Sequence, residues 1–142
     1  MKMYPMFEKD GCSYYGDESY NGAYFDTEQG EIRFIEVCHY YDLPLICFFQ
    51  HENGQKYFGS VDCQIFSSDP NREWAYILVP ITESVYQDLK NNKMKIPVPF
   101  ETAPIGYRVL IKDEKDVIEE VNPRDYEKYQ HELGNAFLDF TK

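Results

Sequence analysis

The stretch from Glu31 to Cys63 constrains the fold of this chain more than any other part of the sequence. The run Leu45-Ile46-Cys47-Phe48-Phe49 is too short for a convincing helix and consists mostly of strand-forming residues. Asn53-Gly54 follows, a dipeptide that accepts the positive φ angles of a tight hairpin turn. Lys56 to Val61 is again rich in strand formers. The pattern predicts two antiparallel strands joined at Asn53-Gly54.

A third strand is predicted from Ile32 to Tyr41, just before this hairpin. Alternation in a strand assigns its side chains to two faces: Ile32, Phe34, Glu36, Cys38 and Tyr40 to one, and Arg33, Ile35, Val37, His39 and Tyr41 to the other. Because both faces carry large groups, we expect a central strand that is covered on both sides. Proline cannot donate to a strand ladder, so Asp42-Leu43-Pro44 is expected to be a link between strands.

The rest of the chain adds short strands and two helices. Further strands are expected at Gly22–Phe25, Glu73–Ile81, Ile105–Lys112 and Val117–Val121. Thr82 is a good N-cap for a helix from Glu83 to Asn91, and Asn122 is a good N-cap for a second helix. Pro97, Pro99 and Pro104 indicate a stiff extended connection. We therefore predict an α+β fold: a bent or barrel-like antiparallel sheet of about six strands, covered by two helices.

The length of 142 residues suits a single domain, residues 1–142. Within it, residues 1–26 form a tyrosine-rich segment, 27–122 a β-rich core, and 123–142 the C-terminal helix and tail. Five tyrosines in the first segment (Tyr4, Tyr14, Tyr15, Tyr20 and Tyr24) supply amphipathic rings that are common at interfaces. The alternative is that this segment wraps the domain and packs its rings on the core.

The net charge of −11, from 25 acidic and 14 basic side chains, narrows the choice of partners. It disfavours nonspecific binding to nucleic acid or to an anionic membrane, and it favours a basic partner. Solubility alone would also explain it. The four cysteines form no CxxC pair, and the start of the chain lacks the apolar core of a secretory signal. No apolar run is long enough to span a bilayer. We expect reduced thiols and a cytoplasmic location, with a secreted, disulfide-bonded protein as the alternative.

Catalytic chemistry has little support in the sequence. Cys38 and His39 are adjacent, so in a strand their side chains point to opposite faces and cannot pair as nucleophile and base. The spacing of cysteines and histidines is a weak signal for zinc, and no glycine-rich phosphate loop is present. We expect no enzyme activity, no metal and no cofactor. A small enzyme or ligand-binding protein, with an aromatic pocket lined by His39, Tyr41 and Trp74 next to Tyr40, is the alternative.

The functional hypothesis is therefore an acidic protein-binding module, an inhibitor, immunity-type or phage-defence accessory factor that masks a basic surface of a partner protein. The residues expected to contact the partner are acidic or aromatic: Tyr14, Tyr15, Asp17, Glu18, Tyr20, Asp113, Glu114, Asp116, Glu119 and Glu120. A second alternative is a homo-oligomeric structural subunit that assembles through the tyrosine-rich start.

Three segments carry a family resemblance: Thr27-Glu28-Gln29-Gly30-Glu31-Ile32-Arg33-Phe34, Tyr40-Tyr41-Asp42-Leu43-Pro44-Leu45, and Trp74-Ala75-Tyr76-Ile77-Leu78-Val79-Pro80-Ile81. Together they resemble a family of short, β-rich bacterial proteins, a domain of unknown function, over about residues 24–122. The resemblance implies a bacterial or phage origin and a single β-rich domain. It implies no activity and carries over no catalytic residues.

Overall fold

A computed structural model describes residues 7–10, 12–14, 20–41, 43–62, 75–112, 115–125 and 137–138. Two short strands, β1 (Phe7–Lys9) and β2 (Cys12–Tyr14), form a two-stranded antiparallel sheet. The main sheet has seven strands: β3 (Tyr24–Thr27), β4 (Gly30–Tyr41), β5 (Leu43–His51), β6 (Lys56–Val61), β7 (Ala75–Ile81), β8 (Gly106–Leu110) and β9 (Val117–Val121). The two helices are α1 (Glu83–Lys90) and α2 (Val98–Thr102). The predicted bent antiparallel sheet is confirmed, with seven strands rather than six, and α1 is the helix predicted after Thr82, whereas α2 lies where an extended connection was expected.

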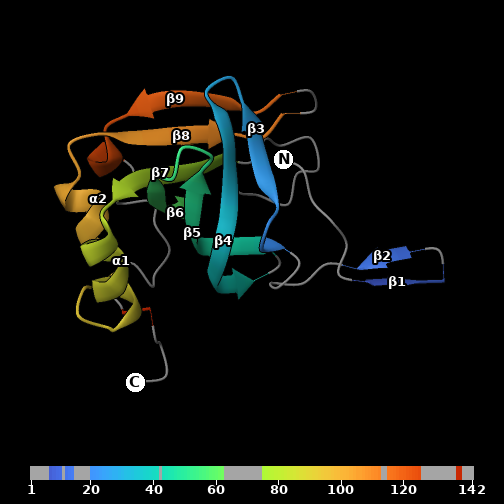
Figure 1. The fold of residues 1–142 in the computed structure, drawn as a ribbon, viewed down its shortest axis with the longest axis horizontal. Coiled ribbons are helices and arrows are strands. Elements are labelled where there is room, and N and C mark those ends of the chain that lie inside the picture. Colours follow the sequence, from blue (N-terminus) through green and yellow to red (C-terminus); the bar gives the residue numbers. More distant parts are fainter. Residues whose placement is uncertain are drawn as a thin grey trace.

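The seven strands form a simple meander, because each pairs in antiparallel fashion with the next one along the chain. Figure 1 shows β3 and β4 turned away from the direction of β8 and β9, so the sheet is strongly bent and nearly barrel-like. Its first and last strands meet at one point, a bridge between Thr27 and Asp116. There the backbone N–H of Asp116 donates to the carbonyl of Asp26, and the Asp116 carboxylate accepts from the N–H of Asp26 at 2.9 Å.

The concave face of the bent sheet is filled by aromatic rings. Phe34 lies 4.6 Å from Phe49 and 5.3 Å from Phe25, measured between ring centroids, and Tyr76 is in contact with all three. All four rings are fully buried. Large rings with offset or edge-on contacts of this kind contribute both apolar burial and ring–ring attraction. This cluster fills the space that the bend of the sheet encloses.

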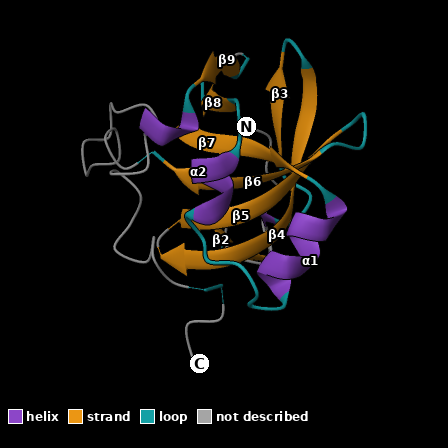
Figure 2. Cartoon of the chain, turned by 90° about the vertical axis from the view of Figure 1, so that its left-hand side faces the viewer, coloured by secondary structure: helices purple, strands orange, loops and turns teal. Residues whose placement is uncertain are grey.

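The two helices cover the opposite face of the sheet, over β4 to β7 (Figure 2). Tyr86 of α1 packs edge-on against Phe48 at 4.7 Å, and Phe100 of α2 packs on Phe58 at 5.6 Å. The N-terminus of α1 is capped as predicted, since the Thr82 hydroxyl accepts a hydrogen bond from the N–H of Val85. The sheet is therefore buried on both faces between β4 and β7.

Two predictions that involve prolines are wrong. The proline-rich connection contains α2, in which Pro97 is the N-cap and Pro99 lies in the first turn. Proline is tolerated at both positions because the first N–H groups of a helix have no partner within the helix. Pro44 is not a link either, because it lies near the start of β5 and pairs with Tyr40. The hairpin at Asn53-Gly54 is confirmed, with Gly54 at a φ of 98°.

The predicted division of the third strand into two faces is also wrong. β4 pairs with β5 through register shifts between Phe34 and Glu36 and between Val37 and His39. Each extra residue of a bulge changes which face the following side chains occupy. Phe34 therefore lies in the concave aromatic cluster, while Glu36 forms an ion pair with Lys90 of α1 at 3.0 Å on the other face. Of the predicted second helix, residues 123–125 form a single 3₁₀ turn, and the next described residue is Phe137.

Candidate functional site

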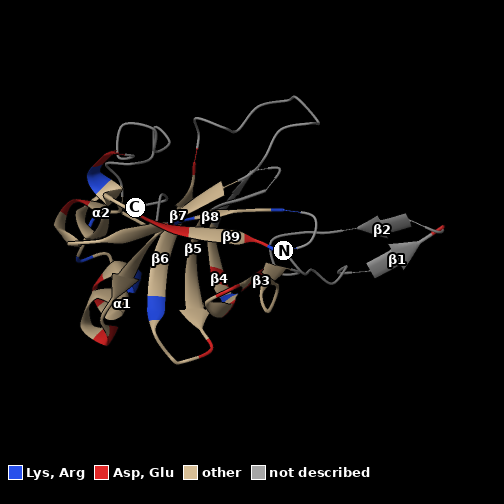
Figure 3. Ribbon diagram, turned by 90° about the horizontal axis from the view of Figure 1, so that it is seen from above, with Lys and Arg blue, Asp and Glu red and all other residues tan. Residues whose placement is uncertain are grey.

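The strand β9 exposes both apolar and acidic side chains. Val117 is 45 % exposed, and the Glu119 side chain is 55 % exposed. Glu120 is also exposed, whereas Ile118 between them is buried in the core. Figure 3 shows this acidic character along β9. Val117 and Phe137 are the two exposed large hydrophobic residues in the described part of the chain, and only Val117 lies beside two exposed carboxylates on a strand.

Two tyrosines extend this surface onto the concave face of the sheet. Tyr107 of β8 lies directly opposite Glu120, and directly opposite residues share a face. Tyr107 packs edge-on against Tyr57 of β6 at 6.0 Å, and both rings are half-buried. Burial, with the neighbouring Tyr107 as a second cause, raises the pKa of the Tyr57 phenol. We call Tyr57, Tyr107, Val117, Glu119 and Glu120 the β9 surface.

A network of ion pairs on the outer face connects Glu119 with Arg108 and Asp62. Arg108 of β8 lies opposite Glu119, and its Nη1 is 3.5 Å from the Glu119 carboxylate. The Nε of the same guanidinium donates to Asp62 at 3.2 Å, and the Asp62 side chain is only 1 % exposed. The Arg108 guanidinium therefore forms ion pairs with two carboxylates, the buried one of Asp62 and the exposed one of Glu119. Because a buried carboxylate needs its cation more than an exposed one does, Glu119 is only partly neutralised.

The ion pairs beside β9 leave an excess of carboxylates. Asp62, Glu119 and Glu120 contribute three carboxylates against the single guanidinium of Arg108, which leaves a net charge of −2 over these four groups. The two exposed carboxylates lie on opposite faces of the strand, since they are adjacent in sequence. A bound cationic group could therefore be met from either side of the sheet.

The structure places the predicted partner-contacting residues in different environments. Glu119 and Glu120 are exposed as expected. The prediction that Tyr20 and Asp116 contact a partner is wrong, because these residues are only 5 % and 3 % exposed. Tyr20 packs its ring on Phe34, and Asp116 bonds backbone groups of β3, so neither side chain offers surface to a partner. The backbone of Tyr14 lies in β2. Its side chain, together with Tyr15, Asp17, Glu18, Asp113 and Glu114, lies outside what the structure describes.

The predicted pocket of His39, Tyr41 and Trp74 stays a prediction. His39 and Tyr41 lie in β4, but their side chains and all of Trp74 lie outside the described part of the chain. The register pairs His39 with Ile46, and continues through β6 to β7.

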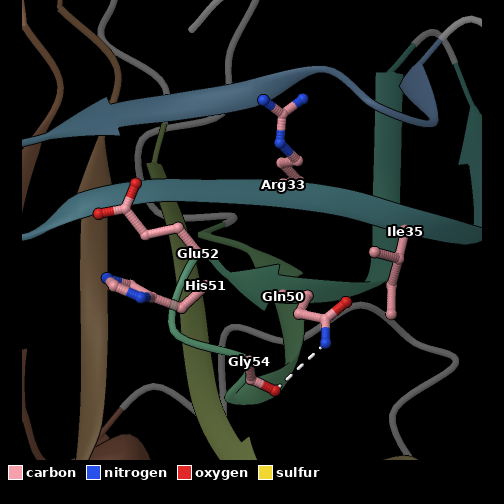
Figure 4. Close-up of a pocket in the computed structure, with 6 residues that line it drawn as sticks. All are labelled: Arg33, Ile35, Gln50, His51, Glu52 and Gly54. Atoms are coloured by element: carbon pink, nitrogen blue, oxygen red, sulfur yellow. Dashed lines mark hydrogen bonds between the residues drawn. The ribbon is translucent and has the colours of Figure 1, made fainter.

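A polar hollow of about 300 Å³ lies on the outer face of β4 and β5, lined by Arg33, Ile35, Gln50, His51, Glu52 and Gly54. Figure 4 shows Arg33 pointing toward β3 and Gln50 pointing to the carbonyl of Gly54. Arg33 forms an ion pair with Glu31 at 2.8 Å. The Nε2 of His51 donates to the Gln29 carbonyl, and its Nδ1 accepts from the N–H of Asn53. Both ring nitrogens are thus engaged, so His51 cannot act as a general base without losing a contact.

The two described thiols lie together at a bulge between β4 and β5, where Cys47 pairs with Val37 and the next residue is Cys38. Burial, and next the charge of Glu36, raises the pKa of the Cys38 thiol well above its ordinary range. Burial has the same effect on the pKa of Cys47. A thiol held in its protonated form is a poor nucleophile and a poor metal ligand. Within the described residues, no group of three or more histidine, cysteine or acidic side chains is arranged to hold a metal ion.

Sequence reasoning identified the glutamates of the β9 surface but missed Tyr57, Tyr107 and Arg108. The sequence did contain a signal for Tyr107 and Arg108. A hairpin between the predicted strands at residues 105–112 and 117–121 pairs Tyr107 with Glu120 and Arg108 with Glu119, if its turn is centred between residues 113 and 114. Tyr57 could not be found in this way, because its contact with Tyr107 crosses the intervening strand β7.

No protein-family model, curated protein or solved structure matched the chain when it was compared with each of these. None of the helices within the described ranges is both long and apolar enough to cross a membrane.

Proposed function

We propose that this protein is an acidic protein-binding module that masks a basic surface of a partner, as an inhibitor, immunity-type or defence-system accessory factor does. The observation that supports the proposal is the composition of the β9 surface. It combines two exposed carboxylates, an exposed valine and a half-buried tyrosine pair. We place its action in the cytoplasm, and the two free thiols of the β4–β5 bulge support this location.

The physical role of each group follows from its position. Half-buried tyrosines can anchor a partner by burying apolar area at a low cost in side-chain entropy, because their rings already have one fixed neighbour. The exposed carboxylates would attract and orient a cationic surface, and the overall charge of −11 would speed the encounter. Such a complex weakens as salt is added, because the exposed charges are screened.

The test is affinity capture of a stoichiometric partner from cells of the source organism, with two matched variants. The first variant, Glu119→Lys with Glu120→Lys, reverses both charges of the β9 surface. The second, Glu28→Lys with Glu101→Lys, makes the same change in net charge at exposed positions in the β3–β4 turn and in α2.

We expect the unaltered protein and the second variant to capture the same basic protein, and the first variant to lose it. Capture should also fall between low and physiological salt. Equal losses from both variants would show that only net charge matters, and equal retention would show that β9 is not the binding surface. Either result would contradict the proposal.

A further inference from the structure

Among the residues that the structure describes, β9 has a ladder on one side only, and its other edge contacts β3 just before the strand begins, at the bridge between Asp116 and Thr27. It pairs with β8 along five residues on one side, from Val117 opposite Leu110 to Val121 opposite Gly106. On its other side, no described strand forms a ladder with it. In an antiparallel pair, alternate residues direct their N–H and C=O groups away from the partner, so part of the β9 backbone faces outward.

The opposite end of the sheet is closed in a different way. The outward N–H and C=O groups of Asp26, in the middle of the edge strand β3, are both bonded by Asp116. These two bonds occupy the positions that an added strand would need. The two edges of the sheet therefore differ in extent: Asp116 occupies the outward groups of Asp26 in the four-residue strand β3, whereas no described ladder covers Val117–Val121 of β9.

Charge decides which occupant fits the β9 edge. Two copies of this chain that paired antiparallel through β9, with the pairing centred on Glu119 or between Glu119 and Glu120, would place glutamates directly opposite each other. Like charges directly opposite each other destabilise a strand pair. The glutamates therefore oppose self-association at this edge, as charged groups on natural edge strands do, and the same carboxylates favour a cationic strand.

From these contacts we infer that the outer edge of β9 binds an extended basic segment of a protein partner, which adds to the sheet as an eighth strand. This inference rests on the proposed function and specifies its mode of binding. Successive side chains of the added strand point to opposite faces. A lysine or arginine at one position would meet Glu119 on the outer face. A cation at the next position would meet Glu120 and the ring of Tyr107 on the concave face.

The experiment uses the full chain and a short capped peptide with the sequence Thr-Val-Lys-Arg-Val-Thr. One control peptide has both cations replaced by glutamate. A second control peptide keeps both cations but is N-methylated at alternate residues. It therefore retains its charge and loses the backbone N–H donors along one edge of the strand. Binding is followed by nuclear magnetic resonance, and protection by the hydrogen exchange of backbone amides.

We expect the basic peptide to bind and to slow exchange of the outward amides of β9, with no slowing in β3. The N-methylated peptide should bind about tenfold more weakly, because it cannot form the backbone hydrogen bonds. The acidic peptide should not bind. Failure of the basic peptide to bind, equal binding of the N-methylated peptide, or protection that is absent from β9 would each overturn strand addition.

The chain with Glu119→Gln and Glu120→Gln serves as a further check, because it removes the charges with little change in shape. It should keep its fold by circular dichroism and should bind the basic peptide about tenfold more weakly; unchanged affinity would overturn the inference. If partner capture depends on Glu119 and Glu120 while the N-methylated peptide binds as well as its parent, the proposed function stands and strand addition fails. If capture of the partner does not change when the charges of Glu119 and Glu120 are reversed, the proposed function itself fails.

Discussion

Replacing Asp116 by alanine should open the seam between the first and last strands of the sheet. Asp116 is only 3 % exposed, and its carboxylate accepts two backbone hydrogen bonds. One comes from the N–H of Asp26 at 2.9 Å, and the other comes from the N–H of Lys112 at 3.2 Å. The side chain thereby joins β3, 90 residues away in sequence, to Lys112, which follows β8. Alanine would leave both N–H groups without this acceptor.

The expected cost follows from these two bonds. A hydrogen bond to a charged group contributes about 1.5 to 3 kcal/mol, and a buried N–H group left without a partner loses a similar amount. The two bonds share one carboxylate, so their contributions are not fully additive. We expect Asp116→Ala to lower the free energy of unfolding by about 3 to 5 kcal/mol, a large fraction of the total for a domain of this size. Asp116→Asn keeps one acceptor oxygen and should lose less, about 2 kcal/mol.

Urea unfolding measures this effect, with the slope of the transition as a check that the denatured state is unchanged. Asp125→Ala is the matched control, because Asp125 is exposed and its removal should change the stability by no more than about 0.5 kcal/mol. Hydrogen exchange at Asp26 and Lys112 should rise in the Asp116 variants before exchange in β5 and β6. A loss below about 1 kcal/mol for Asp116→Ala would refute the idea that this carboxylate closes the sheet.

Three further predictions follow from the packing. Gly59→Ala should destabilise the protein by about 1 to 3 kcal/mol, because a Cβ there would meet the side chains of Leu78 and Phe49 at 2.4 and 2.5 Å; an unchanged midpoint of thermal unfolding would contradict this. Arg108→Met should lower the free energy of unfolding by about 3 kcal/mol, because it removes the cation next to buried Asp62; chemical denaturation beside Lys115→Met, an exposed control, would show whether the pair matters. The pKa of Tyr57 is raised by burial, so the folded protein keeps this proton to higher pH than the unfolded chain does. The contribution of Tyr57 to stability is then complete below about pH 10 and is lost as the pH rises through the folded pKa. Ultraviolet titration of the native protein and of Tyr57→Phe would test this, and a phenol that ionises first among the tyrosines would count against it.

Local signals in the sequence were sufficient for several elements of the fold. The turn at Asn53-Gly54 and the cap at Thr82 each depend on the conformation or hydrogen bonding of a few neighbouring residues, so both were predictable. The bulges of β4 were not predictable, because strict alternation is the default assumption and a bulge is set by the partner strand. Pro97 and Pro99 led to the wrong prediction of an extended connection, because proline can end a helix but is also common at the start of one.

The site was predictable only where charge alone identifies surface. Glu119 and Glu120 could be proposed because adjacent acidic residues in a short strand are rarely both buried. Asp116 has the same chemistry and lies three residues earlier, yet it is buried, because its bonds go to β3, which is distant in sequence. Tyr20 is buried for a similar reason, since Phe34 provides the surface on which its ring packs. Contacts of this kind depend on how the sheet closes, and no local pattern in the sequence predicts that closure.

The central claim, that β9 is the surface through which this protein binds another, is tested most directly by photo-cross-linking in cells of the source organism. A photoreactive amino acid is placed at Val117, which leaves both carboxylates of β9 in place, and a matched one at Glu101 in α2, which is also exposed. We predict a single basic protein cross-linked from position 117 and not from position 101. Cross-linking of the same protein from position 101 alone, or equally from both positions, would contradict the claim.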